Sequence, residues 1–305
     1  MILYFQTWGM EMNGRKILNR LIIIFIAINV ILFVFLSVRR LIQYQLPKER
    51  MDNIIAVLAD KNITFKCELP RDFEPKSSAT LTYTGDSVAA RNDLVSALFG
   101  SSPSKILRST GSREEDPSSK IYYFTKEKEQ LSFNQQQIVY VNSNVDVLTP
   151  KPSPLEAKRM AETFIKRLKL GQMYSSSYVE VREEEHCIDL IYFPVFNNIP
   201  IFDLPIEMKV YQEGIGSATL YLGEINQIKD SKGRITPIDL VLFGIEAYIP
   251  EKNHMVIEDI TLGYKKIQKK GSNLWGEQII PVYKIVIEGL ENPIFVNAYT
   301  NEIVK

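Results

Sequence analysis

Residues Leu21–Val38 read LIIIFIAINVILFVFLSV, and this stretch decides how the rest of the chain is organised. It carries no charge, its polar residues are Asn29 and Ser37, and arginine flanks it at Arg20 and at Arg39–Arg40. A helix rises about 1.5 Å per residue, so the run covers most of a hydrocarbon core that is about 30 Å thick. The stretch predicts one membrane-spanning helix.

The alternative interpretation of this run is a cleaved secretory signal. Such a signal has an apolar region of about 7 to 15 residues and ends at small residues. The run here is longer, and it ends in Phe35, Leu36, Ser37 and Val38 before two arginines. Because the rest of the chain has no second run of this length, we expect one uncleaved anchor that carries one large water-soluble body.

The topology of this anchor is not fixed by its flanking charges. Basic residues precede the run and also follow it: Arg15, Lys16, Arg20, Arg39, Arg40, Lys48 and Arg50. The distribution of basic residues therefore does not decide which end of the helix faces the cytoplasm. Long domains also translocate largely regardless of such charges. We expect a cytoplasmic tip at residues 1–20 and an extracytoplasmic body, in a single-pass protein of the cell membrane. Met1 and Met12 both remain possible starts.

Asn29 gives the predicted span one distinctive face. An amide in hydrocarbon gains roughly 1 to 2 kcal/mol from a hydrogen bond to a partner helix in model peptides. At helical spacing Asn29 shares a face with six apolar residues, and we predict that this face contacts a membrane partner: Ile22, Phe25, Ile26, Leu32, Phe33 and Leu36. The alternative is that a single Asn is tolerated in an otherwise apolar helix.

The composition is that of a globular protein without a nucleic-acid partner. The 305 residues include 36 basic and 36 acidic ones, so the formal net charge is zero. Binding to phosphates needs a concentrated basic surface, which this balance does not favour. The two cysteines, Cys67 and Cys187, lie far apart and form no disulfide framework.

The body is predicted to be α+β, with two extracytoplasmic domains. Helical and alternating segments place a first α+β domain at residues 48–147, followed by a Pro-rich linker. The second domain, 153–305, begins with a capping box at Ser153 and Glu156. It contains one helix followed by antiparallel strands, twice over, at 153–230 and 235–305. This order predicts a duplicated helix-on-sheet unit.

No residues are predicted to be catalytic or to bind a metal or a cofactor. The histidines, His186 and His254, have no metal-ligand spacing. The run Glu183–Cys187 contains ligand types, but consecutive residues of an extended segment point to alternate faces. The sequence contains neither a nucleophile elbow nor a phosphate-binding loop. We therefore predict that the chain is not an enzyme.

Several hydrophobic patterns carry a resemblance to a known family. The segment Phe295–Ile303 (FVNAYTNEI) resembles the last hairpin of a PepSY-type unit, and Ile199–Phe202 with Ala218–Leu222 resembles the repeat before it. With Met12–Lys16 ahead of the span and Ile54–Leu58 after it, the chain resembles the YycI-type members of the YycH/YycI regulatory family. Family members usually open with Met-Asp-Trp, and this chain has no tryptophan at that point.

The resemblance implies a non-catalytic accessory protein of the WalK/WalR (YycG/YycF) two-component system. Its implied partners are a sensor histidine kinase of the WalK type, a YycH-like sister protein and the lipid bilayer, in the control of cell-wall homeostasis. Two other classes remain open. One is a membrane-tethered PepSY-like inhibitor or chaperone of an extracellular peptidase. The other, an anchored cell-wall enzyme, is disfavoured by the absence of a catalytic motif.

Overall fold

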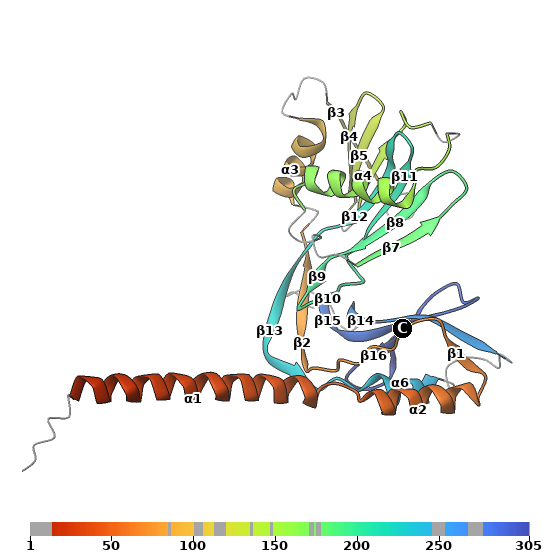
Figure 1. Ribbon diagram of the computed structural model, residues 1–305. Helices are drawn as coiled ribbons and strands as arrows, with labels where there is room; N and C mark the ends of the chain where they lie inside the picture. The colour runs from red at the N-terminus through yellow and green to blue at the C-terminus, as the bar shows by residue number, and fades with distance from the viewer. Residues whose placement is uncertain are drawn as a thin grey trace, which may run out of the picture.

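The protein consists of one long N-terminal helix that projects from a sheet-rich body (Figure 1). The computed structural model describes residues 14–84, 87–100, 106–112, 120–134, 137–146, 149–170, 174, 178–245, 254–267 and 277–304. Helices pack on predominantly antiparallel sheets throughout the body. The predicted α+β fold class, with one apolar helix ahead of the body, is therefore confirmed.

Helix α1, Gly14–Gln43, extends beyond the predicted span at both ends. Its 30 residues correspond to about 45 Å of helix. The segment Ile17–Arg39 is long and apolar enough to cross a membrane, and none of it is buried against the body. Part of the predicted tip, residues 14–20, is thus already helical, while residues 1–13 lie outside the described residues.

An eight-stranded antiparallel sheet forms the lobe that lies farther from α1, here called the distal lobe (Figure 1). Its strand order is β3-β4-β5-β6-β12-β11-β8-β7. The strands are β3 Leu107–Ser112, β4 Lys120–Lys126, β5 Glu129–Asn134, β6 Gln137–Asn142, β7 Tyr178–Glu183, β8 Ile188–Phe193, β11 Ile206–Tyr211 and β12 Gly214–Tyr221. Helices α3, Val88–Phe99, and α4, Pro154–Arg167, share one core with this sheet.

The alternation of side chains along these strands explains why the helices cover one face. Successive side chains of a strand point to opposite faces. Leu131 and Phe133 of β5, and Ile138 and Tyr140 of β6, are buried, while their neighbours are more exposed. These inward residues meet the buried side of α4 in the core.

A seven-stranded sheet forms the lobe next to α1, here called the proximal lobe. Its strands are β1 Ile63–Phe65, β2 Lys76–Tyr83, β13 Gly223–Gly233, β14 Met255–Lys266, β15 Glu277–Ile287, β16 Ile294–Asn297 and β17 Ile303–Val304. The main path is β1-β14-β15-β16-β17, and β2 joins β15 to β13. Helices α2, Lys48–Ala59, and α6, Ile238–Ile245, belong to its core.

Two strands and one hairpin connect the lobes. The chain leaves the distal sheet at Leu222, and β13 then pairs with β2 in the proximal sheet. The hairpin of β9, Val195–Phe196, and β10, Ile199–Pro200, also leads onto the proximal sheet, where Phe202 N–H donates to the Tyr264 carbonyl over 2.9 Å. A third core fills this junction: Ala79, Leu81, Ile199, Ile201, Leu204, Tyr264 and Ile279.

The predicted boundary between a domain at 48–147 and a domain at 153–305 is wrong as a division of the sheets. Strands β3 to β6 pair into one sheet with β7, β8, β11 and β12, whereas β1 and β2 pair with β14 and β15. The segment 48–147 thus contributes to both lobes. Hydrophobic alternation identifies a strand and its buried face. It does not identify which other strand forms the backbone hydrogen bonds with it.

The two predicted repeat units fall mainly into different sheets. The first unit, 153–230, supplies α4 and four strands of the distal sheet, and the second, 235–305, supplies α6 and β14 to β17 of the proximal sheet. However, β13 begins inside the first unit and belongs to the sheet of the second. The segment Ala218–Ile228 therefore contains parts of two strands, which meet at Leu222 and lie in different sheets.

This topology predicts that residues 153–305 do not fold alone. Without β6 the distal sheet loses the partner of β12, and without β2 the proximal sheet loses the link between β13 and β15. We expect a fragment of residues 153–305 to show no cooperative thermal transition in circular dichroism, whereas residues 44–305 unfold cooperatively. Cooperative, protease-resistant folding of the shorter fragment would contradict the pairing described here.

Candidate functional site

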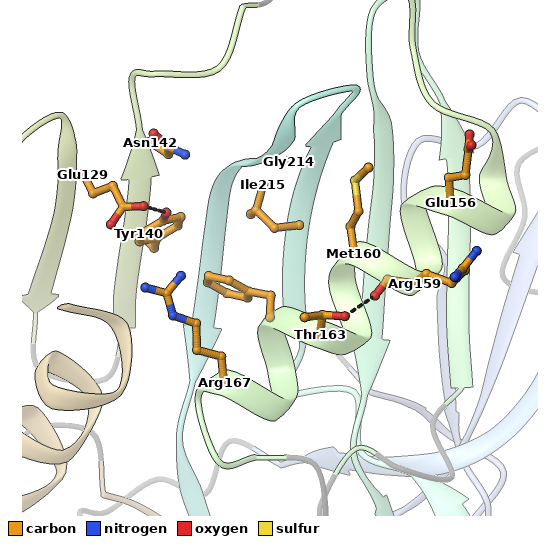
Figure 2. Close-up of a pocket in the computed structure, with 11 residues that line it drawn as sticks. Glu129, Tyr140, Asn142, Glu156, Arg159, Met160, Thr163, Arg167, Gly214 and Ile215 are labelled. Carbon is orange, nitrogen blue, oxygen red and sulfur yellow. Dashed lines mark hydrogen bonds between the residues drawn. The ribbon is translucent and has the colours of Figure 1, made fainter. Parts of the chain in front are cut away.

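A groove runs beside α4 in the distal lobe and encloses about 500 Å³ (Figure 2). Helix α4 forms one side, and the other is formed by β5, β6 and the turn into β12. The apolar residues Met160, Phe164 and Ile215 line it together with the ring of Tyr140. Polar side chains from both sides surround this apolar surface, as Figure 2 shows.

The start of α4 is fixed by the capping box that the sequence predicts. The Glu156 N–H donates to Ser153 Oγ over 3.3 Å, and the Ser153 N–H donates to Glu156 Oε2 over 3.0 Å. The hydrogen bonds from Ser153 hold the pKa of the Glu156 carboxyl below its ordinary value. Glu156 is therefore ionised at neutral pH, and its carboxylate caps the start of α4.

A hydrogen-bonded pair lies on the strand side of the groove. The Tyr140 hydroxyl donates to Glu129 Oε1 over 3.0 Å, across the β5–β6 hairpin. Tyr140 is only 3% exposed, and this burial, followed by the charge of Glu129, raises the pKa of its phenol well above the ordinary value. Tyr140 thus stays protonated and serves as a fixed donor that orients Glu129.

Arg167 lies at the end of the groove that also contains Tyr140 and Glu129. It connects the two helices of the distal lobe. Its guanidinium donates to the carbonyl of Ala97 over 3.4 Å and to the carbonyl of Leu98. These carbonyls belong to the last turn of α3, where backbone acceptors lack partners within the helix. Arg167 therefore caps the end of α3 and links it to α4.

The groove is lined by groups that can hydrogen-bond or pack against a ligand. Its lining offers carboxylates, guanidinium groups, amides and apolar surface. Among the residues that the structure describes, no group of three or more His, Cys, Asp or Glu side chains could hold a metal ion. The ligand-type run Glu183–Cys187 ends β7 and leads into β8, with the Glu184 N–H donating to the Cys187 carbonyl over 3.0 Å. His254 lies elsewhere, 3.5 Å from Thr64 Oγ1.

The predicted membrane face is fully accessible on α1. All seven of its residues are exposed: Ile22, Phe25, Ile26, Asn29, Leu32, Phe33 and Leu36. Asn29 Nδ2 donates to the carbonyl of Phe25 over 2.8 Å. The helix itself therefore satisfies one amide hydrogen of Asn29, since the carbonyl four residues back is within reach. Whether this face contacts a partner stays a prediction.

The connection between α1 and the body contains a charged contact that sequence reasoning missed. Arg50 of α2 holds Oδ2 of Asp239 on α6, with Nε at 2.6 Å and Nη2 at 2.5 Å. Asp239 is 2% exposed, and its Oδ1 has no hydrogen-bond partner among the residues that the structure describes. A signal was present in the sequence, because Asp239 is a lone acid within the apolar helix IDLVLFGI.

Comparisons with known proteins bear on the fold. A crystal structure of an uncharacterized protein from Eubacterium rectale is similar, with a TM-score of 0.52 and 12% identity over 80% of this chain and 91% of that chain. At this identity the similarity concerns the fold alone. The Bacillus megaterium YpeB C-terminal domain aligns with a TM-score of 0.41 and 12% identity, over 71% of this chain and 94% of that chain. No protein-family model matches the chain, and neither does any curated protein.

The contact between Arg50 and Asp239 predicts a specific pattern of stabilities. Arg50→Met leaves a buried carboxylate without a partner, which costs about 1 to 3 kcal/mol of unfolding free energy. The double variant Arg50→Met with Asp239→Leu removes the unpaired charge and recovers most of that loss. Urea unfolding of the full chain, followed by tryptophan fluorescence, measures both effects.

The matched control is Lys48→Met, which removes an exposed cation from the first turn of the same helix. It should leave the unfolding free energy nearly unchanged, because exposed charges contribute little. Equal losses for Arg50→Met and Lys48→Met would show that the contact with Asp239 does not stabilise the protein.

Proposed function

We propose that this chain is a non-catalytic, membrane-anchored regulator of a sensor histidine kinase of the WalK type. The observation that carries the proposal is an apolar helix exposed along its whole span and joined directly to a large body. The resemblance to the YycH/YycI family supports it from the sequence. In this proposal the body lies outside the cell, the partners are the kinase and a YycH-like sister protein, and the process is cell-wall homeostasis.

The link between α1 and the body supports a regulator that acts at both levels. Only residues 44–47 separate α1 from α2. The Leu46 N–H donates to the Arg71 carbonyl over 2.9 Å, the Phe73 N–H donates to the Tyr44 carbonyl over 2.9 Å, and Leu46 is buried. A displacement of α1 is thus passed to the proximal lobe rather than absorbed by a flexible linker. Contacts made by α1 and by the body then act on a partner together.

The energetic requirement on such a regulator is small. A binding partner shifts a two-state kinase only by binding one state more tightly than the other. A difference of about 5.5 kcal/mol moves the equilibrium between states from 1:99 to 99:1, and smaller differences change it partially. Contacts of a single membrane helix and one outer surface are sufficient for this, and no chemical step is needed.

A second function is compatible with the body alone. The groove beside α4 lies in the distal lobe, away from α1. A PepSY-like inhibitor or chaperone of an extracellular peptidase would use such a surface and would need α1 only as a tether. The two functions differ in whether the sequence of the membrane helix matters.

The first test replaces Leu21–Val38 by an unrelated apolar helix of equal length. We expect the swapped protein to lose its effect on kinase autophosphorylation, because it lacks the contact face while remaining anchored. The measurement uses the kinase reconstituted in vesicles with and without each protein. The control is protease resistance of the body, which should not change. Full retention of the effect would show that the sequence of the membrane helix does not matter for regulation, and absence of any effect by the unmodified protein would favour the tethered inhibitor or chaperone.

The second test moves one amide around the helix. We expect Asn29→Leu to weaken co-purification with the membrane partner about fivefold, which corresponds to a loss of about 1 kcal/mol. The matched control combines Asn29→Leu with Ile31→Asn, which keeps the amide but turns it by about 200° around the helix. Unchanged co-purification of both variants would discard the predicted contact face.

A further inference from the structure

The distal sheet has an outer face, on the side away from α3 and α4 (Figure 1). Directly opposed residues of antiparallel strands point to the same face of a sheet, so the strand register defines rows of residues that cross it. The residues two positions to either side of each member of such a row form two further rows. The central row of the outer face runs over five strands, from β3 to β12: Ser109, Tyr123, Ser132, Val139 and Thr219. The three rows together comprise fifteen residues, here called the outer patch.

The outer patch contains no charged residue. Charged residues make up 24% of the whole chain, so a set of fifteen would on average include three or four. Charge returns on the next strand, where Glu207 and Lys209 of β11 lie opposite Thr219 and Ser217. A phosphate-bearing polymer needs cations on the protein, and a charged ligand group that loses water without a partner is costly. The patch therefore favours an uncharged ligand.

The outer patch is accessible and small. None of its fifteen residues is buried, so no element in the described part of the chain covers it. Five strands about 4.8 Å apart span about 19 Å, and three rows two residues apart span about 14 Å, which gives an area of roughly 260 Å². A stable protein–protein interface takes about 800 Å² from each partner. The size of the patch therefore fits a narrow chain better than a folded protein.

Most of the polar groups on the patch both donate and accept hydrogen bonds. Eight of the fifteen residues are Ser, Thr, Asn or Gln, whose hydroxyl groups and amides do both without carrying a charge. Gln137 Nε2 donates to the Tyr221 hydroxyl over 3.3 Å, and this bond orients both side chains. A ligand rich in hydroxyl groups, which also donate and accept, matches such a surface.

Two tyrosines add flat apolar surface to the patch. The ring of Tyr123 lies against Gly111 of the neighbouring strand, because a Cβ atom at Gly111 would lie 3.1 Å from Tyr123 Cε2. Tyr221 lies three strands away from Tyr123 in the sheet, which corresponds to about 14 Å. Each tyrosine combines an apolar ring face with a polar hydroxyl group. The patch thus has two places where a flat ligand ring can pack.

We propose that the outer patch binds an uncharged carbohydrate chain that lies across the strands. The sugar hydroxyls exchange hydrogen bonds with the Ser, Thr, Asn and Gln side chains, and the C–H face of one sugar ring packs on Tyr123. A second sugar of the same chain contacts Tyr221. Carbohydrate binding is separate from the regulation of a kinase, because it involves the distal sheet and requires no contact by α1.

Binding of oligosaccharides to the full chain in lipid nanodiscs is measured by isothermal titration calorimetry. The probes are cellohexaose, chitohexaose and the fully deacetylated chitosan hexamer, which carry a hydroxyl, an acetamido and an ammonium group at the same carbon of each sugar. We expect a neutral hexamer to bind, and the ammonium form to bind about tenfold more weakly, because the patch offers no countercharge. Absence of binding by both neutral hexamers, or equal binding by the ammonium form, overturns the proposal.

Three variants locate the binding surface. Tyr123→Ala should weaken binding of the neutral hexamer about fivefold, because the ring face is lost. The matched control is Tyr178→Ala, which removes an exposed tyrosine from the same face of the same sheet, on β7 and outside the patch. Ser132→Glu places a charge at the centre of the patch and should weaken binding about tenfold. Equal effects of Tyr123→Ala and Tyr178→Ala overturn the assignment to this patch.

Unfolding of a variant does not obscure the result, because the comparison of the three hexamers on the unmodified protein needs no substitution. If neither neutral hexamer binds and Ser132→Glu instead removes the effect on the kinase, the patch is a protein-contact surface and the proposed carbohydrate ligand is wrong. Loss of kinase regulation in the α1 swap has no bearing on these titrations, so the two proposals fail separately.

Discussion

The pairing of β2 with β13 and β15 is the interaction on which the rest of the structure depends. Leu81 lies opposite Ile225 on one side and Glu277 on the other, and its side chain is fully buried in the junction core. All three strands belong to the proximal sheet, so loss of β2 would leave backbone groups of β13 and β15 unpaired and expose apolar side chains at the same time. Lys284 adds to the junction, because it is 7% exposed, contacts Glu180 of the distal sheet and faces the rings of Phe193 and Phe202.

Much of this fold was predictable because it depends on local patterns. The apolar run of α1, the helix Val88–Phe99 and the capping box of α4 are set by residues close in sequence. The exchange of strands between sheets was not predictable in this way. Hydrophobic alternation continues through Leu222, so the local pattern carries no sign that the chain passes there from one sheet to the other. Strand pairing depends on residues that are far apart in sequence, so the local sequence of a strand does not identify its partner or its register.

The same reasoning explains which parts of the candidate site could be predicted. Ser153 and Glu156 were identified because they act on each other over three residues. Glu129 and Tyr140 carried no sign of a groove, because they meet α4 only after β6 pairs with β12. The residue types of Glu183–Cys187 are those of metal ligands, but their adjacency on an extended segment argued against a shared site, and the structure places them at the end of β7 and the turn that follows. Residue types identify candidate site groups, and the pairing of distant strands determines which of these groups lie close together.

The hydrogen bond of Asn29 bears on how tightly α1 can hold a partner. Because one amide hydrogen is already bonded to Phe25, a neighbouring helix gains only the remaining hydrogen and the oxygen. Polar contacts between membrane helices average about 0.6 kcal/mol in double-mutant cycles, so this contact is weak by itself. For the regulator proposed above, such an anchor would favour reversible action, and most of the selectivity would then come from the body. The short link through Leu46 would allow α1 and the body to act together, since its hydrogen bond to Arg71 and its burial attach the end of α1 to the proximal lobe.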